Sequence, residues 1–210
     1  MGSIEGFGQE VDLTATIRSI LSAYTFGTGL FKELLQNSDD AKATKQVILL
    51  DWRSHLAQSL CNPILADKQG PALLAYNNGI LSDSDWKGIR KIYESSKSDQ
   101  SSKIGKYGQG FRSCYHVTDT PQILSGDHLV ILDPQNQIHP DGGVRLNIAD
   151  AAVKFQDQFS VFDCLVPEDQ RGRFFNGTIF RLPLRTTRSR IKDQTVDAKQ
   201  IENLLHEFIR

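Results

Sequence analysis

The sequence predicts an α+β fold in which helices are layered on a mixed, mostly antiparallel sheet. The length of 210 residues suits one domain with a proper hydrophobic core. Apolar residues recur with helical spacing near both ends of the chain, and short apolar runs bounded by turn residues lie between them. No internal repeat or linker is visible, so we expect a single domain over residues 1–210.

Helical periodicity predicts five helices, and cap residues mark where one of them begins. They are expected at residues 11–24, 27–41, 82–93, 111–119 and 198–210. The third should start at Ser82, because Ser82 and Asp85 have the spacing of a capping box. The chain ends directly after the apolar face of the last helix, so we expect it to be a fragment of a longer protein.

Short apolar runs between turn residues predict the strands of the sheet. They are expected at residues 46–52, 71–78, 128–133, 155–165 and 177–185. Residues 94–110 are poor in apolar residues and rich in Ser, Lys and Gly, so we expect a loop there. This loop leads into the helix expected at 111–119.

The charge balance and the cysteines exclude several classes of protein. Lys and Arg number 24 against 25 acidic residues, so the net charge of −1 gives no reason to expect a nucleic acid or an anionic membrane as partner. No apolar run is long enough to span a bilayer, and no signal peptide is visible. Three distant cysteines without a CxxC pair favour a reducing compartment, the cytosol or the nucleus. The five histidines show no metal-ligand spacing.

The second expected helix carries an unusual polar stripe. Glu33, Asn37 and Asp40 fall at i, i+4 and i+7 in "FKELLQNSDDAKATK", within an arc of roughly 60°. A carboxylate and an amide one turn apart can face the same phosphate and its Mg²⁺. The alternative is an ordinary solvated face, which a polar stripe on a helix usually is.

A glycine-rich segment, "GKYGQGF", precedes the fourth expected helix. Gly105, Gly108 and Gly110 let backbone N–H groups approach an anion, and the N-terminus of the following helix favours phosphate. Lys103 and Lys106 can add positive charge. The spacing matches neither the dinucleotide fingerprint nor the P-loop, and a plain loop is the alternative.

Two strand ends carry further polar residues. In "LLAYNNGILSDSDW" an expected strand ends in Asn77, Asn78 and Gly79, whose amides can pair with the edge of an adenine. An Asn-Gly turn is the alternative interpretation. In "NGTIFRLPLR", Thr178 opens a strand and its hydroxyl can bond a base or a water, although β-propensity alone also explains a threonine there.

The order and type of these motifs resemble the GHKL ATPase superfamily, which includes DNA gyrase B, the ninety-kilodalton heat-shock chaperones and histidine kinases. The closer resemblance is to the N-terminal repeat domain of the sacsin type. The segments that carry it are "FGQEVDLTATIRSIL", "LFKELLQNSDDAKATK", "QGPALLAYNN", "SSKSDQSSKIGKYGQGFRSCYHVTD", "LVILDPQ" and "NGTIFRLPLR". The resemblance implies a Bergerat-type site for ATP and Mg²⁺ in a two-layer α/β sandwich, with helices covering one face of the sheet.

The resemblance also implies a role for each candidate residue. Glu33 matches the general base that activates water, Asn37 the Mg²⁺ ligand, and Asp40 a position that lines the nucleotide pocket. Asn77 or Asn78, followed by Gly79, stands where the family places its adenine-reading aspartate, and Thr178 matches the threonine near the adenine. The residues that match the phosphate-cradling lid and its flank are Gly105, Lys106, Gly108, Gln109, Gly110, Phe111 and Arg112.

The sequence departs from the family pattern at the adenine turn and in the lid. An asparagine replaces the aspartate, and Leu81 lies near the position of the second glycine of D-x-G-x-G. Gln109 and Arg112 replace a small apolar residue and an asparagine, and Arg112 fits either phosphate binding or a cap on the pocket. A neutral amide is a weaker acceptor than a carboxylate.

Two functions therefore remain open. The first is a weak, chaperone-like ATPase, cytoplasmic or nuclear, whose lid movement is coupled to neighbouring domains, with client proteins or co-chaperones as partners of the longer protein. The second is a degenerate, non-catalytic module that serves as a scaffold in protein quality control. A histidine-kinase function is disfavoured because no phosphoacceptor histidine box is visible, and a gyrase-like function because no basic patch is.

Overall fold

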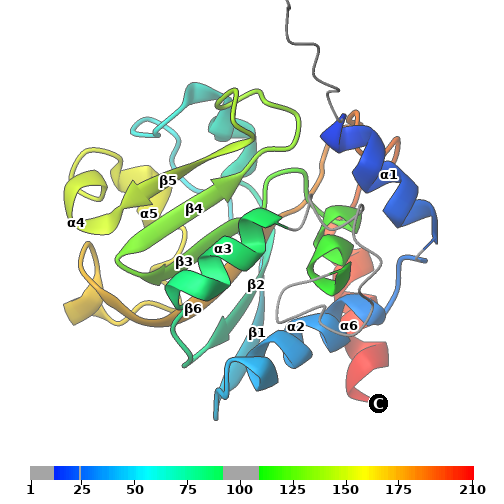
Figure 1. Cartoon of the computed structure of the whole chain (residues 1–210), viewed down its shortest axis with the longest axis horizontal. Coiled ribbons are helices and arrows are strands. Elements are labelled where there is room, and N and C mark those ends of the chain that lie inside the picture. The colour runs from blue at the N-terminus through cyan, green and yellow to red at the C-terminus, as the bar shows by residue number, and fades with distance from the viewer. Residues whose placement is uncertain (1–11, 24, 92–108) are drawn as a thin grey trace, which may run out of the picture.

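A computed structural model of the chain describes residues 12–23, 25–91 and 109–210, and shows a six-stranded sheet. Its strand order is β1-β2-β6-β3-β4-β5, and all five pairings are antiparallel. The strands are β1 (Gln46–Asp51), β2 (Ala72–Asn77), β3 (Gln122–Gly126), β4 (His128–Leu132), β5 (Gly143–Asn147) and β6 (Phe175–Pro183). The predicted α+β sandwich is confirmed. The last strand in the chain, β6, lies in the middle of the sheet between β2 and β3 (Figure 1).

Five helical elements pack on one face of this sheet. They are α1 (Leu13–Ala23), α2 (Gly29–Asp40), α3 (Asp83–Lys91), the 3₁₀ helix η3 (Gln109–His116) and α6 (Ala198–Ile209). Each contributes to one core cluster with the sheet, for example Phe31 of α2, Trp86 of α3 and Phe180 of β6. The five helices predicted from periodicity are therefore present, although the fourth is a 3₁₀ helix rather than an α-helix.

Side-chain caps fix two of these helices at their starts. The Ser82 backbone N–H donates to the Asp85 carboxylate at 2.9 Å, and the Asp85 N–H donates back to Ser82 Oγ at 3.3 Å, as the capping-box spacing predicted. A second capping box, formed by Asp197 and Gln200, begins α6. This second capping box was not predicted from the sequence.

Arg185, two residues after the end of β6, holds the end of η3 in place. Its guanidinium is fully buried and pairs with Asp119 at 2.6 Å. It also donates to the backbone oxygens of His116 and Thr118, at 3.0 and 3.1 Å. A cation that satisfies the last carbonyls of a helix stabilises its C-terminus. This clamp therefore fixes the element that leads out of the segment predicted to be a nucleotide lid.

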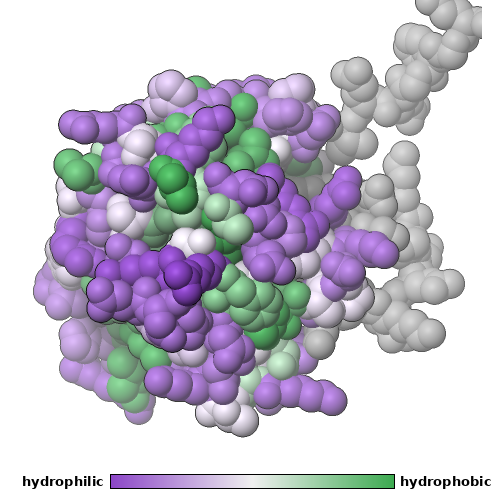
Figure 2. Space-filling model, turned by 90° about the vertical axis from the view of Figure 1, so that its left-hand side faces the viewer, coloured by the Kyte–Doolittle hydropathy of each residue, from purple (hydrophilic) through white to green (hydrophobic). Residues whose placement is uncertain are grey.

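The other face of the sheet is covered by shorter elements. They are η1 (Pro63–Lys68), α4 (Ile148–Ala151), α5 (Gln156–Ser160) and η4 (Glu168–Gln170). Leu65, Ile148 and Phe162 belong to a second core cluster on this face. Seen from the side that carries α4 and α5, the surface is mostly hydrophilic, and apolar side chains show in separate small areas (Figure 2). Helices therefore form the thick layer on one face only, while short turns close the other.

The strand predicted at residues 155–165 is wrong. These residues form α5 and the turns after it, and Asp157 at the start of α5 accepts the backbone N–H groups of Gln58 and Ser59 at 2.7 and 2.9 Å. The apolar run that suggested a strand also contains a helical spacing, with Phe155 and Phe159 four positions apart. Short aromatic runs fit both periods, and the long-range contact to Asp157 decided between them.

Two strands were not predicted. All five residues of β3 are buried, yet only Ile123 and Leu124 are strongly apolar, so the segment gives little sequence signal. The strand β5 is short, lies at the edge of the sheet, and contains Gly143 at φ 151°, where an added Cβ would come within 2.4 Å of the Ile131 carbonyl oxygen. Among the described residues, no helix is long and apolar enough to cross a membrane.

Candidate functional site

A row of polar side chains crosses the sheet at the end where β2 stops. Asn77, the last residue of β2, lies directly opposite Thr178 of β6, and Thr178 lies opposite Ser125 of β3. All three are at most 2% exposed. Each lies two positions from a core residue of its own strand and therefore on the same face of the sheet. These core residues are Ala75, Phe180 and Ile123, which pack beneath the helices, so the row faces the same side as α2. We call Asn77, Thr178 and Ser125 the strand-end row.

A directed chain of hydrogen bonds fixes this row. The Leu81 backbone N–H donates to Ser125 Oγ at 3.0 Å, and Ser125 Oγ and Thr178 Oγ1 lie 2.8 Å apart. Thr178 Oγ1 then donates to the Gly79 carbonyl oxygen at 2.8 Å. Because a carbonyl can only accept, the Ser125 hydroxyl is the donor to Thr178. The row is therefore held in one geometry by the turn that follows β2, and Thr178 keeps one lone pair for a further partner.

The two neighbouring asparagines have opposite surroundings. Asn77 is buried, and its Oδ1 accepts the Gly79 backbone N–H at 2.9 Å. Asn78 is exposed, its Oδ1 accepts the backbone N–H groups of Thr44 and Lys45 at 2.9 and 3.0 Å, and its Nδ2 donates to Thr44 Oγ1. Asn78 thus ties the turn before β1 to the end of β2. Of the two positions that the sequence left open, only Asn77 belongs to the strand-end row.

Gly79 allows the end of α2 to approach this turn closely. A Cβ at residue 79 would lie 3.0 Å from the Ala41 Cβ, 3.1 Å from Asn77 Oδ1 and 3.2 Å from the Ala41 carbonyl oxygen. These contacts are tighter than ordinary van der Waals contact. Ala41 is the residue that caps the C-terminus of α2. The glycine therefore lets α2 and the strand-end row meet at one place, as the nucleotide-site hypothesis needs.

The polar side chains of the stripe on α2 lie beside the sheet and make few hydrogen bonds within the described part of the chain. Asn37 is 5% exposed, and its Nδ2 is buried without a hydrogen-bond partner in the described part of the chain. Glu33 and Asp40 are half-buried. Removal from water raises the pKa of the Glu33 carboxyl. Asn37 is therefore buried rather than solvated, while Glu33 and Asp40 remain partly exposed.

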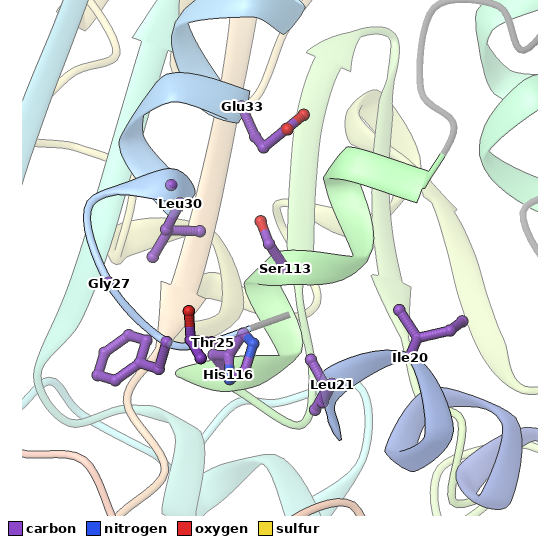
Figure 3. A pocket seen from close by; sticks show the side chains of 10 residues that line it. Ile20, Leu21, Thr25, Gly27, Leu30, Glu33, Ser113 and His116 are labelled. Atoms are coloured by element: carbon purple, nitrogen blue, oxygen red, sulfur yellow. The ribbon is translucent and has the colours of Figure 1, made fainter. Parts of the chain in front are cut away.

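A cavity of about 220 Å³ lies between the end of α1, the start of α2 and η3. Glu33 and Ser113 project into it from α2 and η3, and Ile20 and Leu21 of α1 line its opposite side (Figure 3). Of the residues predicted to bind nucleotide, only Glu33 lines it. The cavity therefore adjoins the candidate site and is distinct from the strand-end row.

Only the end of the segment predicted to be the lid lies within the described residues. Gly105, Lys106 and Gly108 lie outside the described residues, and Gln109 and Gly110 are described only as the start of η3. Phe111 is 3% exposed and its ring centroid lies 5.6 Å from that of Phe180, so it belongs to the core. Arg112 is 4% exposed. Phe111 thus fixes the base of this segment to the sheet rather than touching solvent.

Comparison with known proteins places the chain in a family. The family model for the sacsin domain matches residues 10–210. The chain belongs to the sacsin domain family. It is also 36% identical to human sacsin over 225 aligned positions, which cover 97% of this chain and 5% of sacsin. The chain therefore spans about a twentieth of that relative, and the similarity concerns this domain alone.

The structure of this sacsin domain adds polar residues that the sequence analysis missed. Ser125 lies in an unpredicted strand and links Thr178 to Leu81. Gln46 of β1 lies opposite Asn77, and both of its side-chain amide atoms are buried without a partner among the described residues. No sequence signal marks either residue, because each is placed only by pairing with a strand that is distant in the chain.

One side-chain amide of the candidate site could take part in holding a Mg²⁺-nucleotide. The described residues contain no cluster of three or more His, Cys, Asp and Glu side chains that could hold an ion. Mg²⁺ keeps several waters and commonly takes one or two protein ligands together with phosphate oxygens. The Asn37 Nδ2 group, buried without a partner among the described residues, could donate to a phosphate oxygen, and Mg²⁺ could take the Oδ1 atom of the same amide.

Proposed function

We propose that this sacsin domain binds ATP with Mg²⁺ and hydrolyses it slowly. The observation that carries the proposal is the Asn37 Nδ2 donor, which is buried without a partner among the described residues, on a helix that meets the end of β2 at Gly79. A buried polar group without a partner costs on the order of 1–3 kcal/mol. A ligand that satisfies this group would recover the cost, and a metal-bound phosphate supplies the matching chemistry.

The strand-end row would hold the base of the nucleotide. Thr178 has one free lone pair, and its hydroxyl is fixed by Ser125 and Gly79. The Asn77 amide is fixed by its bond to the Gly79 N–H. Groups that are fixed before binding lose little entropy when a ligand arrives. The row therefore supplies orientation, while Asn37 faces the phosphates.

Mg²⁺, when bound, would neutralise the charge of the phosphates. Within the chain, Asn37 would hold the ion through its Oδ1 atom, and Glu33, one helical turn away, would accept a proton from the attacking water. Burial raises the pKa of Glu33, which makes this carboxylate a stronger base than an exposed one. The segment that contains Gly105, Lys106, Gly108, Gln109 and Gly110 is proposed to contact the phosphates.

Titration calorimetry of the chain with ATP and ADP, each with and without Mg²⁺, tests the proposal. Saturable binding that strengthens with Mg²⁺ is expected. The Asn37→Ala variant should lose the Mg²⁺ dependence, whereas Asn78→Ala, whose side chain is occupied by Thr44 and Lys45, should keep it. Absence of binding at millimolar nucleotide would reject the proposal.

One observation favours a second function, that of a degenerate module. Oδ1 of Asn77 already accepts the Gly79 N–H, so one of its two lone pairs is occupied. The adenine amino group needs an acceptor, and the remaining lone pair of this neutral amide is a weaker acceptor than a carboxylate. In this case the domain would act as a scaffold that binds clients or co-chaperones in protein quality control. Equal and weak affinity for ATP and GTP would favour it.

The proposed ATPase function implies a role in the longer protein. An ATPase of this kind would couple its nucleotide state to neighbouring domains of a longer protein and act on client proteins in the cytosol or nucleus. Proteolytic footprinting of a longer chain with and without ATP tests the coupling. Nucleotide-dependent protection outside residues 10–210 is expected, and identical footprints would contradict it.

A further inference from the structure

The cavity between α1, α2 and η3 has walls that are mainly apolar. Ile20 and Leu21 of α1, Phe26 of the connecting loop and Leu30 of α2 line it (Figure 3). Its volume of about 220 Å³ exceeds that of the roughly 150 Å³ cavity that is known to admit benzene. A six-membered ring with a short substituent therefore fits within it.

Two polar side chains on one side of the cavity lack hydrogen-bond partners among the described residues. The Ser113 hydroxyl oxygen is buried and has no hydrogen-bond partner among the described residues. Glu33 projects toward the same space, and within the described residues its carboxylate makes no hydrogen bond or ion pair. An acidic acceptor beside a hydroxyl favours a ligand that donates hydrogen bonds and carries positive charge.

The opposite end of the cavity is closed by side chains that already have partners. The rings of Phe26 and His116 stack with centroids 5.6 Å apart. Lys192 Nζ lies 3.0 Å from His116 Nδ1 and 5.6 Å from the centre of the Phe26 ring. This lysine is therefore engaged by the two rings. Among the described residues that line the cavity, Glu33 is the one carboxylate.

We infer that this cavity binds a small amine with an aromatic or branched apolar body, its ammonium group directed to Glu33 and Ser113 and its body among Ile20, Leu21, Phe26 and Leu30. The site is separate from the strand-end row and, within the described part of the chain, shares Glu33 with the proposed nucleotide site. It requires no nucleotide, so it can exist whether or not the domain binds ATP.

Glycines at the cavity wall allow a sharp test. Gly29 and Gly27 both line the cavity, and a Cβ added at either meets no atom within 4 Å. A leucine at either position would fill the space without a clash. Gly88 of α3 also has nothing within 4 Å of an added Cβ but lies outside the cavity. Gly88→Leu is therefore a matched control for Gly29→Leu.

The experiment is a titration of the nucleotide-free chain with benzylamine, followed by amide ¹H–¹⁵N correlation spectra. Saturable shifts are expected at Thr25, Gly27, Gly29 and Ser113. Benzyl alcohol should bind several-fold more weakly and benzoate more weakly still. Gly29→Leu should abolish the shifts, and Gly88→Leu should preserve them. Glu33→Gln should reduce the preference for benzylamine over benzyl alcohol.

Three results would overturn the inference. They are the absence of saturable shifts at tens of millimolar benzylamine, unchanged binding by Gly29→Leu, and benzoate binding as tightly as benzylamine. If Gly29→Leu fails to fold by circular dichroism, Gly27→Leu takes its place with the same expectations. Because the titration contains no nucleotide, a failure here leaves the proposed ATP site untouched, and a failure of ATP binding leaves this result untouched.

Discussion

The strand-end row and the polar stripe of α2 lie on the same side of the sheet, yet they differ in how their polar groups are satisfied. In the row, Ser125 and Thr178 bond each other and the turn around Gly79. On α2, the Asn37 Nδ2 and the Glu33 carboxylate lack partners among the described residues. A fully bonded network is rigid and stabilises the fold, whereas unpartnered buried groups cost stability. In the function proposed above, the row would position the base and the stripe would meet the phosphates.

The largest expected effect is that of Asn37→Leu, which removes the unpartnered amide. Mg²⁺-dependent ATP affinity should fall at least about tenfold, which corresponds to about 1.4 kcal/mol. The unliganded fold should be unchanged or more stable, because an apolar group of similar size replaces a buried polar group without a partner. Calorimetry and urea unfolding measure the two quantities. A loss of stability together with unchanged ATP affinity would place Asn37 in the fold rather than in the site.

Thr178→Val tests how much the hydrogen bonds of the strand-end row contribute to stability. It removes a buried hydroxyl that donates to the Gly79 carbonyl oxygen and is paired with Ser125. The free energy of unfolding should fall by about 1–3 kcal/mol, because the remaining partners stay buried without a hydrogen bond. Thr178→Ser keeps the hydroxyl and should lose less. If the two variants melt at the same temperature, the network contributes nothing measurable.

Asn78→Ala separates the two asparagines that the sequence could not distinguish. Its side chain bonds only the exposed turn at Thr44 and Lys45, so we expect a loss of about 0.5–1.5 kcal/mol in unfolding free energy and no change in nucleotide affinity. Asn77→Ala should lower both. A drop in ATP affinity for Asn78→Ala alone would reverse the assignment.

The smallest expected effect is the pH dependence of stability that Glu33 causes. Burial raises the pKa of its carboxyl in the folded state, so ionisation is more costly in the fold than in the unfolded chain. Stability should therefore decrease as pH rises from the ordinary glutamate pKa through the raised one, and stay lower above it. Glu33→Gln should exceed the wild type in stability at neutral pH, by less than about 1 kcal/mol, and match it at acidic pH. Urea midpoints at two pH values measure this, and a larger gap at acidic pH would contradict the sign.

The helices on the α2 side of the sheet could be predicted because the sequence patterns that specify them span only a few residues. The stripe of Leu30, Phe31 and Leu34 specifies a buried helical face, and Ser82 with Asp85 specifies a helix start. Four strands were also predicted within one or two residues, since each is a short apolar run between turn residues. The strand predicted at 155–165 was wrong because its aromatic spacing fits a helix equally well.

By itself, the sequence determined the α+β class, most of the elements and the polar stripe of α2, because periodicity and capping act over a few residues. Only the tertiary structure decided that Asn77 and not Asn78 faces the helices, that Ser125 joins Thr178, and that a cavity opens beside Glu33. Each depends on a register between segments far apart in the chain. A shift of one residue in that register turns every side chain of a strand to the opposite face, and no local pattern encodes it.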